Sequence, residues 1–482
     1  MKKIIIFLLG VVLLASCKKV LEEVPKDFIS KANYYKDASD AQGAITGAYS
    51  SLTTNYNIDY WLFLVLHTDY DNGRGSQAPI SFFDQILDQS NIDRAGRIWS
   101  SFYQTINRAN SVIDNVPGIN MDEGAKKIIL AEAHFLRAMA YFDLVRGFGP
   151  LPIKTQESVD INSIASPRKP VDSVYQLIVA DALVAEQGLP PSVGASTGKA
   201  SVWAAKMLLA EVYLTTEQWD KAATEADDII QHGPYSLVAV QQPNDFYKIF
   251  ASETNTEDIL SIHYSATSQS DEATYMHRAN TPPYNYKSSG FYAWLPNLNS
   301  FIGSQWNDND LRKSFNLYTK YIGPDGDSVS LPSATPVLFK KFISDAQGLS
   351  TTSLPVFRFS EAFLIYAEAA GMASGGPTPM ALERLNMIKR RGYGYDPATA
   401  SPVDYQAGMS QQEFRDSVLQ ERAYEFLLEG KRWWDLKRTG TVKEALAAIG
   451  KNFIDARLLW PISADEINNN PDIGQQGQNP GY

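Results

Sequence analysis

Residues 198–235 constrain the fold more than any other part of the sequence, because they read as two helices folded back on each other. The tetratricopeptide pattern repeats about every 34 residues. Five residues of this segment match it: Leu209, Ala210, Tyr213, Ala222 and Pro234. The first Trp of the pattern is absent, and Lys206 stands in its place. Short side chains allow two helices to approach closely, and such a hairpin buries its apolar face only by stacking on others. The segment therefore predicts a mainly α-helical fold built from stacked hairpins.

The composition is that of a globular protein. The 482 residues are 44% hydrophobic and 12% aromatic, which is too apolar for a disordered chain. The net charge is −11, and removal of residues 1–16, which contain two lysines and no acidic residue, changes it to −13. A negative excess of this size argues against nucleic acid or an anionic lipid surface as a partner.

The N-terminus has the features of a secretory signal peptide. Two lysines precede a short apolar run at 4–14, and small residues then lead to Cys17. The run is too short to cross a membrane. A Cys directly after small residues resembles the bacterial lipobox, so we predict a signal peptide at 1–16 and a lipid anchor on Cys17. The alternative is an ordinary signal peptide whose cleavage site happens to precede a Cys.

Apolar residues recur at helical spacing on both sides of a less regular central region. The expected helices cover 37–52, 97–115, 125–146, 171–187, 360–372, 379–391 and 411–438. Between 236 and 355, Pro, Gly, Asn and Ser are frequent, and only short strand-like pieces such as 259–262 occur. The sequence therefore predicts one domain over 17–482. In it, a helical scaffold (32–235 and 356–450) carries a loop-rich insertion (236–355) with few short strands.

Six segments follow one another in a characteristic order over nearly the whole chain. They are the lipobox at Cys17, AEAHFLRAMAYFDLVRGFGPLP at 131–152, LLAEVYLTTEQWDKA at 208–222, FRFSEAFLIYAEA at 357–369, ERAYEFLLEGKRWWDLKRTG at 421–440 and LLWPISADEINNNPDIGQQGQNPGY at 458–482. Together, in this order and spacing, they resemble the SusD/RagB family of outer-membrane nutrient-binding lipoproteins of Bacteroidota.

The resemblance implies a mainly helical fold in which tetratricopeptide-like hairpins support a loop-rich face. It also implies a lipoprotein held at the outer membrane and facing the cell surface. The implied partner is a SusC-like TonB-dependent transporter, which family members cap as a lid while they hand over oligosaccharides or, in some members, peptides. No cofactor and no enzymatic activity are implied. One feature differs from many surface lipoproteins of the phylum, because Lys18 and Lys19 directly follow Cys17 where acidic residues are common.

The sequence carries no recognisable catalytic motif. Its five His residues lack metal-ligand spacing, its single Cys cannot form a thiolate metal site, and neither a G-x-S-x-G elbow nor a P-loop occurs. Glu421, Glu425 and Glu429 fall on one face of an expected helix, where paired carboxylates suggest a glycosidase. Adjacent turns of one helix cannot flank a sugar ring from opposite sides, however, and several Arg and Lys residues share the segment. We therefore predict an ion-pair network, with no catalytic residue and no metal site.

Residues 275–306 are the first candidate for ligand binding. They hold eight aromatic residues in 32 positions, which is 25% against 12% in the whole chain. Aromatic rings suit the apolar C–H face of a sugar, and loops on a rigid scaffold commonly carry such groups. Some of the rings must instead hold the loop in place. The predicted ligand contacts here are Tyr284, Tyr292, Trp294 and Trp306.

A second candidate follows the first helices. Trp61 is succeeded by four residues that can hydrogen-bond to sugar hydroxyls: Asp69, Asp71, Asn72 and Arg74. The resemblance supports this choice, because an early loop also lines the binding face in the family. We predict ligand contacts from Trp61, Asp71, Asn72 and Arg74. The alternatives are that Trp61, inside the run WLFLVL, belongs to the core and that the Asp-Asn-Gly sequence is simply a turn.

Two other functions are compatible with parts of the sequence. Tetratricopeptide repeats often form a groove for peptides, so the chain could be a protein-interaction module or a peptide-binding member of the same family. Such a groove usually needs several regular repeats, whereas long insertions separate irregular ones here. An exported glycan-degrading enzyme would need an acid/base pair that the sequence does not offer. The leading hypothesis is a surface lipoprotein that captures a glycan and feeds a transporter.

Overall fold

The computed structural model describes residues 34–158, 165–194, 198–250, 255–264, 305–323, 325–331, 333, 337–342 and 353–482, and most of them are helical. The α-helices are α2 (Ala38–Tyr49), α3 (Leu52–Asn55), α4 (Ile58–Val65), α5 (Gln89–Asn115), α6 (Glu123–Phe148), α7 (Val171–Gly188), α8 (Val202–Thr215), α9 (Trp219–His232), α10 (Tyr247–Phe250), α12 (Leu311–Asn316), α13 (Phe359–Ala373), α14 (Pro379–Gly392), α15 (Gln411–Glu425), α16 (Arg432–Arg438), α17 (Val442–Ala448) and α18 (Ala464–Asn469). The short 3-10 helices are η3 (Gly75–Ser81), η4 (Val116–Gly118), η6 (Pro243–Phe246), η8 (Asp455–Leu458) and η9 (Gln475–Gly477). The strands are β1 (Leu151–Pro152), β2 (Arg168–Lys169), β3 (Asp258–Ile262), β4 (Leu317–Tyr318), β5 (Lys320–Ile322), β6 (Ser328–Ser330), β7 (Leu338–Phe339) and β8 (Leu354–Arg358).

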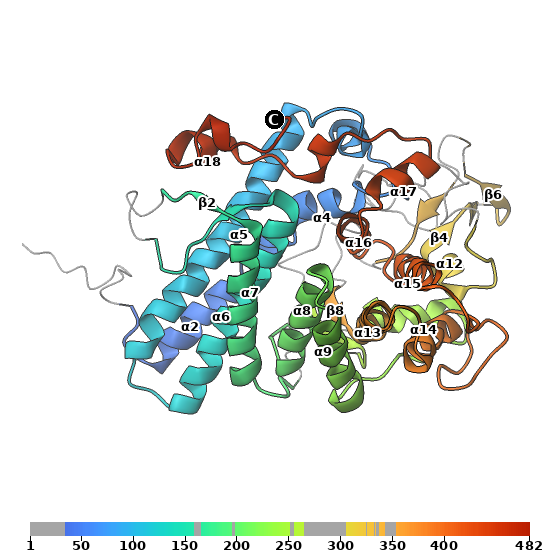
Figure 1. Ribbon diagram of the computed structural model, residues 1–482, viewed down its shortest axis with the longest axis horizontal. Coiled ribbons are helices and arrows are strands. Elements are labelled where there is room, and N and C mark those ends of the chain that lie inside the picture. Colours follow the sequence, from blue (N-terminus) through green and yellow to red (C-terminus); the bar gives the residue numbers. More distant parts are fainter. Residues whose placement is uncertain are drawn as a thin grey trace, which may run out of the picture.

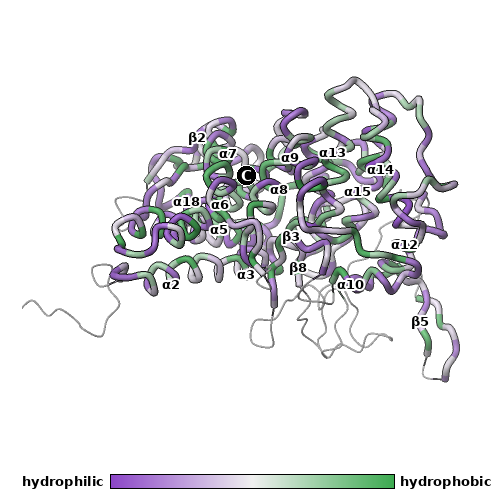
Figure 2. Tube along the Cα trace, turned by 90° about the horizontal axis from the view of Figure 1, so that it is seen from below, coloured by the Kyte–Doolittle hydropathy of each residue, from purple (hydrophilic) through white to green (hydrophobic). Residues whose placement is uncertain are grey.

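The long helices form a row that runs along the long axis of the molecule (Figure 1). Neighbours in the row are α5 and α6, then α7, α8 and α9, and finally α13, which contacts α9, α14 and α15. Figure 2 shows the row from below, with α9 and α13 along one side and α2, α3 and α10 along the other. This stack of antiparallel helices confirms the predicted mainly α-helical scaffold.

The hairpin predicted at 198–235 is formed by α8 and α9. Ala210 and Ala222 are fully buried, as the close approach of two packed helices requires. A tight turn joins the helices, and the Gln218 backbone N–H closes it by donating a hydrogen bond to the Tyr213 carbonyl oxygen at 2.8 Å. Helix α9 then packs on α13, which extends the stack into the C-terminal half.

Helix α6 is the central buried helix of the N-terminal half. The Asp122 side chain caps its first turn by accepting a hydrogen bond from the Ala125 amide at 2.8 Å. Over 131–148 nearly every side chain is buried, as the apolar pattern predicts. The helix stops at Gly149, whose φ of 74° suits a glycine. Because α6 contacts both α5 and α7, it ties the first three long helices into one layer.

The helix expected at 411–438 is in fact two helices, α15 and α16, separated by a turn. Leu428 and Gly430 in this turn have positive φ angles of 63° and 76°. A Cβ atom on Gly430 would lie 2.7 Å from the Leu64 side chain of α4, so the turn packs closely against the N-terminal half. The prediction of one continuous helix is therefore wrong, and Glu429 lies in the turn instead of on a helix face.

Four pairs of short antiparallel strands accompany the helices in the described ranges. The pair β3–β8 joins two segments that are far apart in the sequence, with Asp258 opposite Arg358 and Ile262 opposite Leu354. It brings the two ends of the intervening chain side by side. The hairpin β5–β6 extends from the body at the end near α12 (Figure 2). These few short strands agree with the predicted fold class.

None of the described helices combines the length and the hydropathy that a membrane crossing requires.

Candidate functional site

A buried network of ion pairs surrounds the end of α15. Glu421, Glu425 and Glu429 are each paired, and their partners come from other parts of the chain: Arg312, Lys341, Arg358 and Arg391. Burial alone would raise the pKa of Glu425, but the surrounding guanidinium groups hold this pKa far below its usual range. The ion-pair interpretation of these carboxylates is confirmed, although the basic residues of their own segment are not the main partners.

The residues predicted after the first helices lie at different depths. Trp61 is only 3% exposed in α4, and its indole nitrogen donates to the Leu428 carbonyl oxygen at 3.4 Å. Asp71 is fully buried, Asn72 is half-buried and Arg74 is exposed. The predicted ligand contacts of Trp61 and Asp71 do not fit this burial, because neither side chain reaches the surface. The alternative that Trp61 belongs to the core is the one that the structure supports.

Asp71, Asn72 and Gly73 form a compact loop. The Asn72 backbone N–H donates to Asp71 Oδ1 at 2.6 Å, and the Lys451 ammonium group donates to Asn72 Oδ1 at 2.7 Å. A Cβ atom on Gly73 would lie 2.7 Å from the Gln77 carbonyl oxygen, so this position needs a glycine. Burial lowers the pKa of Lys451 to about 8, although nearby carboxylates oppose the shift. These bonds give the Asp-Asn-Gly sequence a structural role.

The aromatic stretch 275–306 is described only at its C-terminal end. Three of its predicted contacts lie outside the described residues: Tyr284, Tyr292 and Trp294. Trp306 is 2% exposed and stacks on Tyr424 of α15, with ring centroids 4.5 Å apart and an interplanar angle of 11°. The Lys313 ammonium group donates to the Trp306 carbonyl oxygen at 2.8 Å. Trp306 therefore anchors the stretch to α15, and its predicted ligand contact does not fit its burial.

The exposed apolar pair that lies next to η3 was not predicted from the sequence. Phe82 and Ile86 are each 45% exposed, whereas the intervening Phe83 is buried. Arg457, near the C-terminus, fixes this loop by donating to four backbone carbonyl oxygens: those of Pro79, Ile80, Phe82 and Gln85. It also donates to His67 at 2.9 Å, and burial together with this charge holds the pKa of His67 well below its usual value. The adjacent Phe-Phe pair was the only signal, because one of two neighbouring rings on a loop commonly faces outward.

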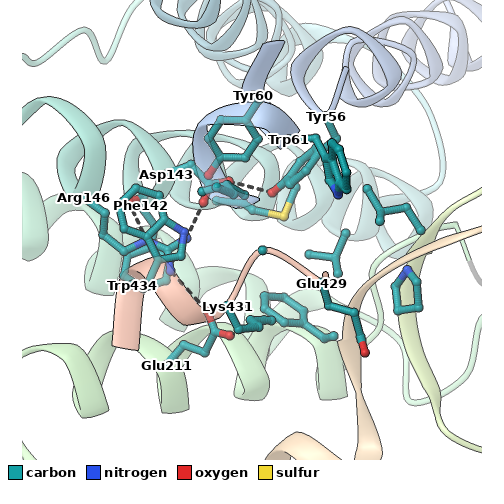
Figure 3. Close-up of a pocket in the computed structure, with 17 residues that line it drawn as sticks. Tyr56, Tyr60, Trp61, Phe142, Asp143, Arg146, Glu211, Glu429, Lys431 and Trp434 are labelled. Atoms are coloured by element: carbon teal, nitrogen blue, oxygen red, sulfur yellow. Dashed lines mark hydrogen bonds and ion pairs between the residues drawn. The ribbon is translucent and has the colours of Figure 1, made fainter. Parts of the chain in front are cut away.

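A narrow cavity lies between the N-terminal and C-terminal halves (Figure 3). Helices α4, α6 and α8 line it from the N-terminal half, and β8, the turn at 429–431 and α16 line it from the C-terminal half. Six of the 17 lining residues are aromatic: Tyr56, Tyr60, Trp61, Phe142, Phe357 and Trp434. The cavity has a volume of about 50 Å³, measured as the space that the centre of a water molecule can reach. One water needs about 10–15 Å³ by this measure, so the cavity holds a few waters and is too small for a sugar ring.

Charged groups run along the same cavity. Asp143 pairs with Arg146, whose guanidinium group lies 3.7 Å from Glu211 (Figure 3). Lys431 bridges Glu211 and Glu361, at 2.9 Å from the latter. Burial and the charge of Glu211 raise the pKa of Glu361 to about 8. For Glu211 the charges of Lys431 and Arg146 outweigh burial and lower the pKa to about 2. Lys431 thus faces one charged carboxylate and one that keeps its proton at neutral pH.

This proton predicts a pH dependence of stability. The unfolded chain releases it near the ordinary glutamate pKa of 4.5, whereas the folded protein retains it up to about pH 8. The raised pKa therefore adds stability that is fully present below pH 4.5 and is lost as the pH rises to about 8, on the order of 5 kcal/mol in total. Glu361→Gln is neutral throughout, so we expect it to become progressively more stable than the unaltered protein over this window.

Urea unfolding of both proteins at several pH values between these limits measures the difference. A difference that does not change with pH would mean that Glu361 is already charged in the folded protein.

A wider hollow opens beside α15, α16 and α17. Its volume of about 770 Å³ lies within the range of about 300–1,000 Å³ typical of small-molecule sites. Its polar lining includes Gln305, Gln412, Asp416, Ser417, Gln420 and Glu444, and its apolar lining consists of Leu419, Leu436, Ala445, Ala448 and Ile449. Asp69 also lines the hollow. Since Asp69 and Gln305 belong to the two stretches singled out in the sequence, these stretches meet here.

The hollow combines an apolar floor with a polar rim. Leu436 and Ile449 are 3% and 8% exposed and form the floor, whereas the carboxylates of Asp416 and Glu444 are exposed at the rim. The Gln412 amide donates to Asp416 at 2.8 Å. An arrangement of this kind suits a ligand that has an apolar face and hydroxyl groups around its edge, which is how a sugar ring is built.

Two family models match separate parts of the chain. One is described as the SusD family and matches residues 300–482. The other is described as "Starch-binding associating with outer membrane" and matches residues 27–214. Together they cover both ends of the helical scaffold and leave out most of the loop-rich region.

Curated relatives match almost from end to end. The chain is 27% identical to SusD-like protein P2 of Formosa agariphila over 521 residues, which covers 99% of both chains. It is 25% identical to SusD-like protein P38 of the same organism, covering 98% of this chain and 97% of that protein.

Solved structures share the fold over more than nine tenths of the chain. A SusD homologue from Bacteroides thetaiotaomicron superposes with a TM-score of 0.79 at 21% identity, over 93% of this chain and 98% of that one. A laminarin-binding SusD-like protein gives a TM-score of 0.74 at 22% identity, over 93% and 100%. Surface glycan-binding protein A from Bacteroides fluxus gives 0.73 at 22% identity, also over 93% and 100%. On the matches of both family models, the full-length relatives and the shared fold, the chain belongs to the SusD/RagB family.

Proposed function

We propose that the protein is a lipoprotein of the outer membrane that captures an oligosaccharide and delivers it to a TonB-dependent transporter, which it caps as a lid. Membership of the SusD/RagB family carries this proposal. Two fold neighbours whose names state laminarin binding and surface glycan binding support it, as does the family model described as associating with the outer membrane. The protein binds its glycan without turning it over.

The glycan binds in the hollow beside α15, α16 and α17. Size favours this place, because the hollow has room for sugar rings and the inner cavity does not. The C–H faces of the sugar lie on Leu436 and Ile449, and its hydroxyls pair with the amides of Gln412 and Gln420. Four residues named from the sequence remain proposed contacts: Arg74, Tyr284, Tyr292 and Trp294.

Filling the hollow tests this placement. Ala448→Trp is expected to weaken glycan binding by at least about tenfold, because an indole at this exposed position of α17 occupies the hollow. Ala447→Trp is the matched control, since Ala447 is exposed on the same helix but does not line the hollow. Glycan and peptide arrays probed with the chain from Lys18 onward identify the ligand. Calorimetry then measures the affinity of this ligand for the unaltered protein and for both variants.

Unchanged binding in both variants would place the glycan elsewhere. A signal from peptides alone would favour the alternative of a peptide-binding member of the family or a protein-interaction module. Release of shorter products from a bound glycan would contradict binding without turnover.

The anchor and the partner need separate measurements. An intact mass of membrane-extracted protein that includes a lipid on Cys17, with residues 1–16 removed, is the expected result. An unmodified Cys17 would contradict the anchor. Purification of the anchored protein from membranes in mild detergent is expected to bring the transporter with it, and its absence under these conditions would contradict the lid.

A further inference from the structure

The hollow beside α15, α16 and α17 has an uneven charge. Among the described residues that line it, three are acidic, namely Asp69, Asp416 and Glu444, and Arg432 is the only base. Arg432 holds Asp69 in a bidentate pair, with distances of 3.0 and 2.7 Å, so these two charges cancel. One base against three acids leaves the lining with a net charge of −2, and this charge is carried by Asp416 and Glu444.

Both remaining carboxylates line the hollow without a charged partner among the described residues. They are exposed, and within the described part of the chain neither takes part in a salt bridge. The bond from the Gln412 amide orients Asp416 but, being neutral, does not compensate its charge. Asp416 comes from α15 and Glu444 from α17, so a ligand that fills the space between these helices lies close to both.

We propose that Asp416 and Glu444 make the hollow selective for uncharged glycans and reject glycans that carry carboxylate or sulfate groups. The inference rests on the proposed function and specifies its substrate class. The neutral groups of the lining, such as Gln305, Gln420 and Ser417, hydrogen-bond to sugar hydroxyls whatever else the glycan carries. An anionic substituent a few ångströms from either carboxylate is repelled, and this unfavourable pairing discriminates between otherwise similar ligands.

The repulsion between the two carboxylates and an anionic glycan should depend on the salt concentration. Because both carboxylates are exposed, dissolved ions screen them over a distance of about 10 Å at 0.1 M ionic strength. The rejection of an anionic glycan is therefore strongest at low salt and weakens as salt is added. Hydrogen bonds from the neutral amides have no such dependence, so the affinity for an uncharged glycan stays nearly constant.

The experiment compares each glycan with an anionic derivative of the same backbone. Laminarin, xylan and mannan oligosaccharides and their sulfated counterparts are titrated into the lipid-free chain from Lys18 onward at low and high salt. The unaltered protein is expected to bind the neutral member of a pair at least about tenfold more tightly at low salt. The variant that combines Asp416→Asn with Glu444→Gln is expected to close most of this gap, because its affinity for the sulfated member rises relative to its affinity for the neutral one.

A charge control separates the hollow from the whole molecule, whose net charge is also negative. Asp220→Asn combined with Asp465→Asn removes the same charge at exposed positions that do not line the hollow, and it is expected to leave the gap unchanged. Equal binding of sulfated and neutral glycans by the unaltered protein would overturn the proposed selectivity while leaving the glycan-binding function intact. Closure of the gap by the control variant would also overturn it, since overall charge would then be responsible. Failure to bind every glycan, neutral and sulfated, would contradict the proposed function itself.

Discussion

Arg358→Met is expected to lower the free energy of unfolding by about 3–5 kcal/mol. Arg358 is 2% exposed, and its guanidinium group donates to the side chains of Glu425, Glu429 and Ser360. Removal of this group leaves buried carboxylates with too few positive charges, and a buried charge without compensation costs far more than a pair contributes. Urea denaturation followed by circular dichroism measures the loss.

Arg97→Met is the matched control for this substitution. The Arg97 side chain pairs with Asp59 but is 56% exposed, so its loss is expected to change the free energy of unfolding by less than about 1 kcal/mol. Adding Glu429→Gln to Arg358→Met is expected to recover part of the lost stability, because one of the uncompensated carboxylates is then neutral. If Arg358→Met behaved like Arg97→Met, water would have to reach the network, contrary to its burial.

Trp460→Ala is expected to have a similarly large effect, about 3–5 kcal/mol. Trp460 is 1% exposed and makes edge-to-face contacts with Tyr60, Phe63 and Phe148 at centroid distances of 6.0, 5.0 and 5.4 Å. These rings belong to α4 and α6, so Trp460 attaches the C-terminal segment to the N-terminal half. Deletion of the ring leaves a large void at this junction, and chemical denaturation measures its cost.

Two further variants define the origin of that loss. Trp460→Phe keeps an aromatic ring at the junction and is expected to cost less than the alanine variant. Gly147→Ala is expected to destabilise the same junction by overpacking it, because a Cβ atom there would lie 2.5 Å from the Trp460 ring. Full stability of Trp460→Ala would show that the C-terminal segment is not part of the common core.

The helical stack could be predicted because its signals are local. Small residues such as Ala210 and Ala222 recur at fixed offsets within one hairpin, and the offsets alone identify it. The break between α15 and α16 could not be predicted in this way. The positive φ angles of Leu428 and Gly430 go with packing against Leu64, which is more than three hundred positions away in the sequence. A periodic pattern contains no information about such a contact.

The candidate site could be predicted only in part. A high density of aromatic residues marks a stretch as unusual, but it does not tell which rings face solvent, and Trp61 and Trp306 are buried. The hollow itself depends on faces of α15 and α17 where residues such as Gln412 and Glu444 look like ordinary exposed helix positions. Their relation to Gln305 exists only once the chain is folded.

The antiparallel pair β3–β8 has a consequence for how such proteins diversify. Because Ile262 and Leu354 are paired at its inner end, the chain between them starts and finishes at one fixed point on the scaffold. The free-energy cost of closing a loop, which is entropic, rises by only about 0.6 kcal/mol for each doubling of its length. The length of the intervening chain can therefore change at little cost, but Arg312 and Lys341 within it pair with Glu421 and Glu429, so an exchanged segment must keep these two basic residues. The two strands are natural splice points for chimeras that keep these ion pairs while one family member is given the specificity of another.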